Sequence, residues 1–390
     1  MHLLVITDGF PYPLTSGRLR QFHLMQHLSP HHRMTLVSAV PRDHPAQDAA
    51  ALAGCVERIE TVRSRRGRRR TFLAKVWNRY HPEDTRAVEQ RIASLHAMDP
   101  FDAVLNARLP LPLRRLLPGV PIVTDICDAV SDGLLSRMRF APPSQVLLLL
   151  AKHLDARRDE NQMAAESDHV LFASARDRAT LARRVSLPPS TVLPNGVDSE
   201  YWQRRTTRLG RNTIVFAGAM SYPPNEDAAI HLIRTIMPVV RRSRPDARLL
   251  IVGRDPTPRL FRAARAQANV EVTGYVEDMR DYLEQASVVV AALRYATGIQ
   301  NKVLEAMSMA VPVVLTPIAE AGLLRIGAVP PPLDVASDPE QIAAFAVRRL
   351  EAADRGGGPD LAARAWVSER FRWDVVSAEL DEVIRATTRT

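Results

Sequence analysis

The amino-acid sequence predicts an α/β protein built from two doubly wound parallel-sheet domains. Strand-like apolar runs alternate with amphipathic helical segments along the chain, which is the pattern of parallel sheets covered by helices. The alternation starts afresh in the second half, and 390 residues exceed the usual size of one domain. A composition of 46% hydrophobic and 24% charged residues excludes disordered and fibrous classes.

The first half contains short apolar runs that predict strands at residues 2–7, 34–40, 56–62, 103–107, 121–126 and 169–174. A loop rich in Pro, Ser and Gly follows the first run, and a helix is predicted after it over residues 18–29. A longer helix is predicted over residues 145–167. Its apolar start, QVLLLLAKHL, is expected to pack in the core, with contact to a membrane as the alternative.

The second half repeats the pattern, with strands predicted at residues 212–218, 247–253, 270–274, 287–293 and 311–316. Helices are predicted at residues 227–242, 276–286 and 302–310, followed by a helical tail at 359–390. The turn-rich segment LPNGVDSEYW marks the junction between the halves. We therefore expect domains at 1–195 and 196–372, and a C-terminal helix at 373–390 that crosses back to the first domain.

The net charge of +9 comes almost entirely from one segment. Residues 61–80 contain no acid and eight basic residues, namely Arg63, Arg65, Arg66, Arg68, Arg69, Arg70, Lys75 and Arg79. Without them the net charge is +1, so no nucleic-acid partner is expected. We interpret residues 63–79 as a solvated loop; the alternative is peripheral contact with anionic lipid or an acidic glycan at the inner membrane face.

Several simple signals favour a cytoplasmic protein. Two cysteines, Cys55 and Cys127, are too few for a disulfide framework or a metal cluster, and no metal site is expected. No uncharged apolar run reaches the roughly 18 residues that a membrane span needs. The N-terminus has no basic leader and carries an acid at Asp8, so we do not expect a signal peptide.

The segment YATGIQNKVLEAM (295–307) carries the clearest chemistry. It follows an apolar strand and opens a helix, so it lies at the carboxyl edge of a parallel sheet, where such folds bind ligands. Gly298 permits close approach to the backbone, and the helix start favours an anion. Lys302 and Glu305 share one helix face and suit the phosphates and the ribose of a nucleoside diphosphate. The alternative is an ordinary salt bridge within the helix.

These residues resemble a known family. GIQNKVLEAMSMAVPVVLT is similar to the donor-binding segment of glycosyltransferase family 4, whose members are nucleotide-sugar enzymes of GT-B architecture. Further similar segments follow the family's order: LPNGVD, FAGAMSYPPNEDA, LLIVGRDP and VTGYVEDMRDYL. ICDAVSD and SARDRATL resemble a bacterial branch linked to exopolysaccharide export. The resemblance implies two Rossmann-like domains that face a cleft.

The resemblance also implies a donor-binding set. Glu305 matches the second Glu of the family's E-x7-E motif, which holds the ribose hydroxyls, and Thr297 stands in place of the first. Lys302 is expected to replace the family's missing diphosphate cations. The glycine loop, the base-contacting backbone and the helix start complete the set: Gly17, Gly218, Val276, Thr297, Gly298, Ile299, Gln300, Lys302 and Glu305.

In the first half, Asp125 and Asp128 follow a strand after which the family often places a histidine. Either carboxylate is a candidate to orient or deprotonate an acceptor hydroxyl, and helix capping by Asp128 is the alternative. Cys127 between them is expected to be a small core residue. Arg18 and Arg20, which flank the glycine loop, are candidate contacts for acceptor or phosphate, whereas His31 and His32 are expected in a solvated loop.

The resemblance implies a retaining, metal-independent glycosyltransferase of hexosyltransferase type. It would move a sugar from a nucleotide-sugar donor to a hydroxyl of a glycan, a lipid-linked sugar or a natural product. No protein nucleophile and no cofactor are expected, because the departing phosphate takes the acceptor proton and the protein stabilises charge and aligns the reactants. Two alternatives remain: a GT-B nucleotide-sugar epimerase, and a non-catalytic nucleotide-sugar-binding subunit.

Overall fold

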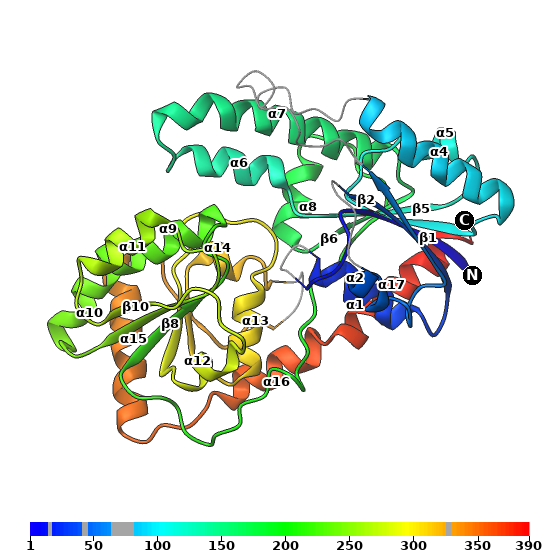
Figure 1. The fold of residues 1–390 in the computed structure, drawn as a ribbon. Helices are drawn as coiled ribbons and strands as arrows, with labels where there is room; N and C mark the ends of the chain where they lie inside the picture. The colour runs from blue at the N-terminus through cyan, green and yellow to red at the C-terminus, as the bar shows by residue number, and fades with distance from the viewer. Residues whose placement is uncertain (15–17, 41–45, 64–81, 325–328, 390) are drawn as a thin grey trace. The chain divides into compact units, whose positions relative to one another are not determined.

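The computed structural model describes residues 1–14, 18–40, 46–63, 82–324 and 329–389. The chain divides into two compact units (Figure 1). The first unit comprises Met1–Gly196 and Trp373–Thr390, and the second comprises Val197–Arg372. Each unit therefore has its own sheet and its own core.

The sheet of the first unit has seven parallel strands in the order β3-β2-β1-β4-β5-β6-β7. Their bounds are β1 His2–Asp8, β2 Arg33–Val40, β3 Arg58–Arg63, β4 Ala103–Ala107, β5 Ile122–Cys127, β6 His169–Phe172 and β7 Ser190–Val192. Chain order reverses between β1 and β4. The carboxyl ends of these two strands are thus the topological switch point of the sheet.

Helices cover both faces of this sheet because neighbouring residues of a strand point to opposite sides. Leu3 and Val5 of β1 pack in one cluster with side chains of α1 and α17, whereas Leu4 and Ile6 pack on the other face against α4. The helices are α1 Leu19–Leu28, α2 Ala46–Ala50, α4 Pro82–Met98, α5 Leu113–Leu116, α6 Val130–Met138, α7 Pro143–Ala165, α8 Ala175–Ala182 and α17 Trp373–Thr387.

The C-terminal helix α17 belongs to the first unit and is fixed there by polar and aromatic contacts. Nε2 of His32 lies 2.6 Å from Oδ1 of Asp381 on α17. The ring of His23 on α1 stacks on Trp373, with 4.8 Å between the ring centroids. The solvated loop predicted for His32 is therefore wrong, because this histidine is buried beneath the returning helix.

The sheet of the second unit has six parallel strands in the order β10-β9-β8-β11-β12-β13. The strands are β8 Thr213–Ala217, β9 Arg248–Val252, β10 Val270–Val272, β11 Val288–Ala291, β12 Val313–Leu315 and β13 Asp334–Val335. The helices are α9 Pro223–His231, the π-helix η1 Leu232–Ile236, α10 Met237–Ser243, α11 Pro258–Arg265, α12 Arg280–Glu284, α13 Asn301–Ser308, α14 Pro317–Glu320, α15 Pro339–Asp354 and α16 Leu361–Arg370.

Two helices of this unit differ from the sequence prediction. The helix predicted at 276–286 is confined to α12, because the Asp278 carboxylate accepts a hydrogen bond from the backbone N–H of Arg280 at 2.9 Å and delays the helix start. The single helix predicted at 227–242 begins earlier, at Pro223, where proline suits a first helical position. It also contains the π-helical turn η1.

Among the described residues, no helix combines the length and the apolar character that a membrane span requires.

Candidate functional site

The switch point of the second unit lies between β8 and β11, where the strand order reverses. Gly218 follows β8 with φ of +149°, a value that favours glycine. The loop that carries Thr297 and Gly298 follows β11 and leads into α13. Gly298 has φ of +62°, and its carbonyl oxygen lies so close to Gly322 that a Cβ at residue 322 would approach it to 2.5 Å. The loop is therefore held tightly against its neighbour.

Lys302 extends from the first turn of α13 towards the end of β8. Its Nζ donates hydrogen bonds to Oδ1 of Asn225 at 2.7 Å and to Oε1 of Gln300 at 3.0 Å. A Cβ placed on Gly218 would lie 2.6 Å from the Asn225 amide nitrogen and 3.2 Å from Cε of Lys302. Residues from β8, α9 and α13 thus converge on one ammonium group at the switch point.

Burial changes the acid–base properties of this group and of its neighbour Glu305. Desolvation lowers the pKa of Lys302 to about 8, and the nearby Glu305 opposes that shift. Desolvation raises the pKa of Glu305 to about 7, again opposed by Lys302. Both shifts mean that water has been removed from the two charges and that their mutual attraction does not compensate for it.

Glu305 is one helical turn beyond Lys302, but the two do not form the salt bridge that was the alternative prediction. In the described part of the chain, the Glu305 carboxylate has no ion-pair partner within 4.0 Å and no hydrogen bond. A partly buried carboxylate without a partner can accept hydrogen bonds from a ligand's hydroxyl groups.

The other predicted donor residues are divided between this site and its surroundings. Gln300 occupies the N-cap position of α13 and is fixed by a hydrogen bond from its Nε2 to the Thr297 carbonyl at 3.2 Å. Ile299 is buried, and Val276 lies after β10, two residues beyond Gly274 with its φ of +74°. Gly17 falls outside the described residues.

Two residues of this site were not selected from the sequence. Asn225 is buried near the start of α9 and is the partner that orients Lys302. Arg294, after β11, donates from Nε to the Asp227 carboxylate at 2.8 Å and ties this loop to α9. No local sequence pattern links these residues, which lie far apart along the chain and become neighbours only because β8 and β11 are adjacent.

In the first unit, Asp125 is held in a buried ion pair with Arg20 of α1. Nε and Nη2 of Arg20 donate to the two Asp125 oxygens at 2.6 and 3.1 Å, and both side chains are 2% exposed. Nη1 of Arg20 donates to the Pro194 carbonyl and to Asn195, next to the passage between the units. Both oxygens of the Asp125 carboxylate are thus engaged by Arg20, and its predicted contact with an acceptor hydroxyl stays a prediction.

Asp128 has a different environment. Its side chain is 26% exposed, and its nearest cation is Arg108, with 3.8 Å between Nη1 and Oδ2. Its N–H bonds the Ile126 carbonyl around Cys127, whose φ is +64°, which makes a γ-turn of a kind that stores strain. Helix capping is not its role, because Ala129 occupies the N-cap position of α6. Cys127 is buried, as predicted, and burial raises the pKa of its thiol.

Among the described residues, no group of three or more His, Cys, Asp or Glu side chains is arranged to hold a metal ion.

Comparison with known families matches residues 211–351 to the model described as "Glycosyl transferases group 1". The matched region begins just before β8 and ends within α15, so it contains Gly218, Asn225, Lys302 and Glu305. A comparison with curated protein sequences finds no match.

Solved structures share the fold of the whole chain. Anabaena Alr3699/HepE in complex with UDP is similar with a TM-score of 0.70 and 12% identity, covering 99% of this chain and 100% of that chain. Sucrose-phosphate synthase from Thermosynechococcus elongatus is similar with a TM-score of 0.69 and 14% identity, covering 99% of this chain and 98% of that chain. MurG from Acinetobacter baumannii is similar with a TM-score of 0.51 and 14% identity, covering 99% of both chains. The predicted fold class, two Rossmann-like parallel-sheet domains of GT-B type, is confirmed.

Proposed function

We propose that this protein is a glycosyltransferase that moves a sugar from a nucleotide-sugar donor to an acceptor hydroxyl. The observation that carries the proposal is that Lys302 and Glu305 lie at the switch point after Gly218, where both are partly buried and not ion-paired with each other. The match of residues 211–351 to a glycosyltransferase family supports it, as does the fold shared with a structure that contains UDP.

The donor's diphosphate would bind Lys302, and its ribose would bind Glu305. A phosphate oxygen near Nζ would replace the neutral amide oxygens of Asn225 and Gln300 as the partner of the ammonium group. Because charge-assisted hydrogen bonds are roughly twice as strong as neutral ones, this exchange favours binding. Gly218, which has no side chain, leaves room beside Lys302, and the N-terminal dipole of α13 adds to the attraction for an anion.

The acceptor would bind in the first unit, with Asp128 oriented towards its hydroxyl. We assign a retaining reaction of family 4 type with a hexosyl donor, in which the departing diphosphate takes the acceptor proton. This chemistry needs alignment and stabilisation of the leaving group rather than a protein nucleophile. Lys302 and the helix dipole supply that stabilisation, so the proposal includes no metal ion or cofactor.

The cellular location and acceptor class extend the proposal. We place the enzyme in the cytoplasm, at the inner face of the membrane, where exopolysaccharide or natural-product acceptors are assembled. The arginine block at 63–79 lies outside the described residues except for Arg63 at the end of β3. Its contact with anionic lipid stays a prediction from sequence.

A two-stage experiment tests the function. Thermal-shift measurements with UDP, GDP, dTDP and ADP sugars identify the donor, because a ligand bound only by the folded state raises the melting temperature. Release of free nucleoside diphosphate is then measured with and without candidate acceptors. Release that requires an acceptor supports glycosyl transfer. Epimerisation without release supports the epimerase, and binding without turnover on any acceptor supports the non-catalytic subunit.

A further inference from the structure

The α6–α7 hairpin of the first unit exposes an unusual number of large apolar side chains. Among the described residues, sixteen large hydrophobic side chains are exposed, and five of them lie between residues 135 and 154. They are Leu135, Phe140, Leu147, Leu150 and Leu154, which we call the hairpin patch. Isolated exposed leucines are common, but a cluster of this kind on two adjacent helices marks an interaction surface.

The helical period places the patch on one face of α7. Leu147, Leu150 and Leu154 follow the i, i+3, i+7 spacing of a single helix face, and they are 76%, 42% and 55% exposed. Leu149 points the other way and is buried. The sequence prediction that the apolar start of α7 packs in the core is therefore wrong for these three leucines.

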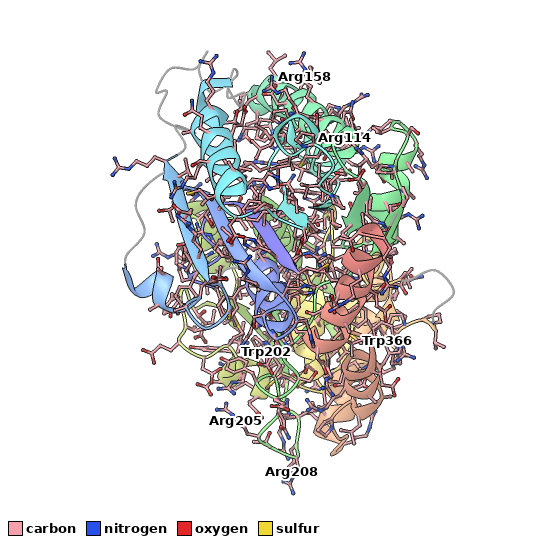
Figure 2. All side chains as sticks on the ribbon, turned by 90° about the vertical axis from the view of Figure 1, so that its right-hand side faces the viewer. Arg114, Arg158, Trp202, Arg205, Arg208 and Trp366 are labelled. Atoms are coloured by element: carbon pink, nitrogen blue, oxygen red, sulfur yellow. The ribbon has the colours of Figure 1, made fainter. Side chains whose placement is uncertain are left out.

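Basic side chains also lie on the hairpin. Arg137 and Arg139 stand at the end of α6 and Arg158 lies on α7 one turn beyond Leu154, while the nearest acidic residues are Asp132 and Asp155. In the part of the chain that the structure describes, none of these three cations forms an ion pair. Arg158 is exposed and is labelled in Figure 2. The surface thus combines apolar side chains with unneutralised positive charge.

The base of the hairpin is firmly held. Glu160 of α7 is buried and accepts hydrogen bonds from the backbone N–H and the hydroxyl of Ser131 on α6, at 2.9 and 2.7 Å. Arg184 also bonds this carboxylate, and Nδ1 of His153 lies 2.7 Å from the Ser131 carbonyl oxygen. Helices α6 and α7, which lie side by side in Figure 1, are thus fixed to each other and to the rest of the unit at the base of the hairpin.

We propose that the hairpin patch docks the protein onto an anionic lipid surface. The leucines and Phe140 enter the boundary between headgroups and acyl chains, and Arg137, Arg139 and Arg158 bind the lipid phosphates. Charge favours this occupant over a second copy of the chain. A symmetric dimer through the same patch would bring the same three cations of both copies together.

Docking also bears on the proposed glycosyl transfer. Helix α6, which carries Leu135 of the patch, begins two residues after Asp128, so the patch and this carboxylate belong to the same segment of the first unit. This extension rests on the proposed function and points to lipid-linked acceptors. Docking itself does not depend on catalysis, and the binding experiment below can therefore fail while glycosyl transfer stands.

The test is sedimentation of the full-length protein with lipid vesicles. Vesicles of phosphatidylcholine alone are compared with vesicles that also contain phosphatidylglycerol. The variant Leu147→Gln/Leu150→Gln/Leu154→Gln removes the apolar face, and Arg137→Gln/Arg139→Gln/Arg158→Gln removes the charge. The matched control Met98→Gln/Leu361→Gln/Val375→Gln changes three exposed apolar side chains elsewhere. Circular dichroism and gel filtration establish that each variant is folded.

We expect wild type to sediment with anionic vesicles and each patch variant to bind about 10- to 100-fold more weakly, whereas the matched control binds like wild type. Salt at about 1 M, where the Debye length falls to about 3 Å, should weaken wild-type binding. The proposal is overturned if the leucine variant binds as tightly as wild type, because binding would then come from another surface such as residues 63–79. It is equally overturned if wild type ignores both kinds of vesicle, or forms a dimer that the leucine variant abolishes.

Discussion

The two units share a sheet topology but use charge at their switch points in opposite ways. In the first unit, Arg20 and Asp125 satisfy each other in a buried, doubly hydrogen-bonded pair. In the second unit, Lys302 is paired only with neutral amides, and Glu305 has no hydrogen-bond partner among the described residues. The first arrangement is complete without a ligand, whereas the second contains two desolvated charges.

This difference gives a physical criterion for separating structural charges from binding charges. A buried ion pair with good geometry offsets the cost of its own desolvation and can fix two segments to each other. Arg20 fixes α1 to Asp125 of β5 and to residues 194 and 195, just before the chain enters the second unit. Charges whose desolvation is not offset shift their pKa values, as Lys302 and Glu305 do. A ligand that supplies the missing partners then binds to charges that are already partly desolvated.

The largest effect should come from breaking the buried ion pair between Arg20 and Asp125. Arg20→Ala leaves the Asp125 carboxylate buried without a partner, which should lower the free energy of unfolding of the first unit by about 3–5 kcal/mol. Urea denaturation measures this loss. The control Arg33→Ala removes an arginine from an exposed pair with Asp99 and should change stability little. Equal stability of both variants would mean that Arg20 and Asp125 do not hold the unit.

The next largest effect should distinguish Asp128, whose substitution changes turnover, from Asp125, whose substitution changes stability. Asp128→Asn is expected to lower kcat by roughly tenfold, because a neutral amide replaces the charge-assisted hydrogen bond that orients the acceptor hydroxyl, with nucleotide affinity unchanged. Asp125→Asn should act mainly on stability. Steady-state kinetics with the identified donor and acceptor, together with a denaturation curve for each variant, test both expectations. Full activity of Asp128→Asn would remove this residue from the proposed site.

Nucleotide binding by Lys302 and Glu305 should depend on pH. Burial lowers the pKa of Lys302 to about 8, so the ammonium group loses its proton above that pH, and affinity for a nucleoside diphosphate should then fall by up to about tenfold per pH unit. A bound phosphate favours the protonated form, and binding near pH 8 should take up a proton. Calorimetry in buffers of different ionisation enthalpy measures this uptake.

The variant Lys302→Arg provides the comparison for the pH dependence. Its guanidinium group stays protonated over the whole accessible range, so the alkaline loss of affinity should disappear, whatever the variant's absolute affinity. If wild type and Lys302→Arg lose affinity in parallel above pH 8, the titrating group is not Lys302.

A smaller effect is expected at Gly218. A Cβ there would lie 2.6 Å from the Asn225 amide nitrogen, at a φ of +149° that side chains rarely adopt. Gly218→Ala should displace Asn225 and weaken nucleotide binding a few-fold. Gly358→Ala is the control, because a Cβ at Gly358 meets nothing within 4 Å and its φ is not in the left-handed region. A silent Gly218→Ala would show that Asn225 does not help to position Lys302.

Much of the fold follows from local patterns, because a parallel strand is a short apolar run and its helices are amphipathic. Strands of three and two residues, β7 and β13, carry too little pattern to be predicted. The position of Lys302 on the first turn of a helix after a strand was also predictable. Its partner Asn225, 77 residues away, was not, because the contact depends on which strands are neighbours.

The remaining errors concern burial, which a single sequence reveals poorly. Asp125 and Asp128 look equivalent in the sequence, yet Arg20, 105 residues away, donates to both oxygens of Asp125. His32 looked like a loop residue and is covered by α17, and the leucines of the hairpin patch looked like core. In each case the deciding contact, or its absence, comes from an element distant in sequence.

The central claim is that Lys302 and Glu305 are binding charges, and isothermal titration calorimetry with the nucleoside diphosphate of the identified donor tests it most directly. Lys302→Ala and Glu305→Ala should each lose about 1.5–3 kcal/mol, or roughly 10- to 100-fold in affinity. Arg242→Ala and Glu340→Ala, from an exposed pair in the same unit, should bind like wild type. If both Lys302→Ala and Glu305→Ala bind as tightly as wild type, the nucleotide does not bind at Lys302 and Glu305, and the central claim is contradicted.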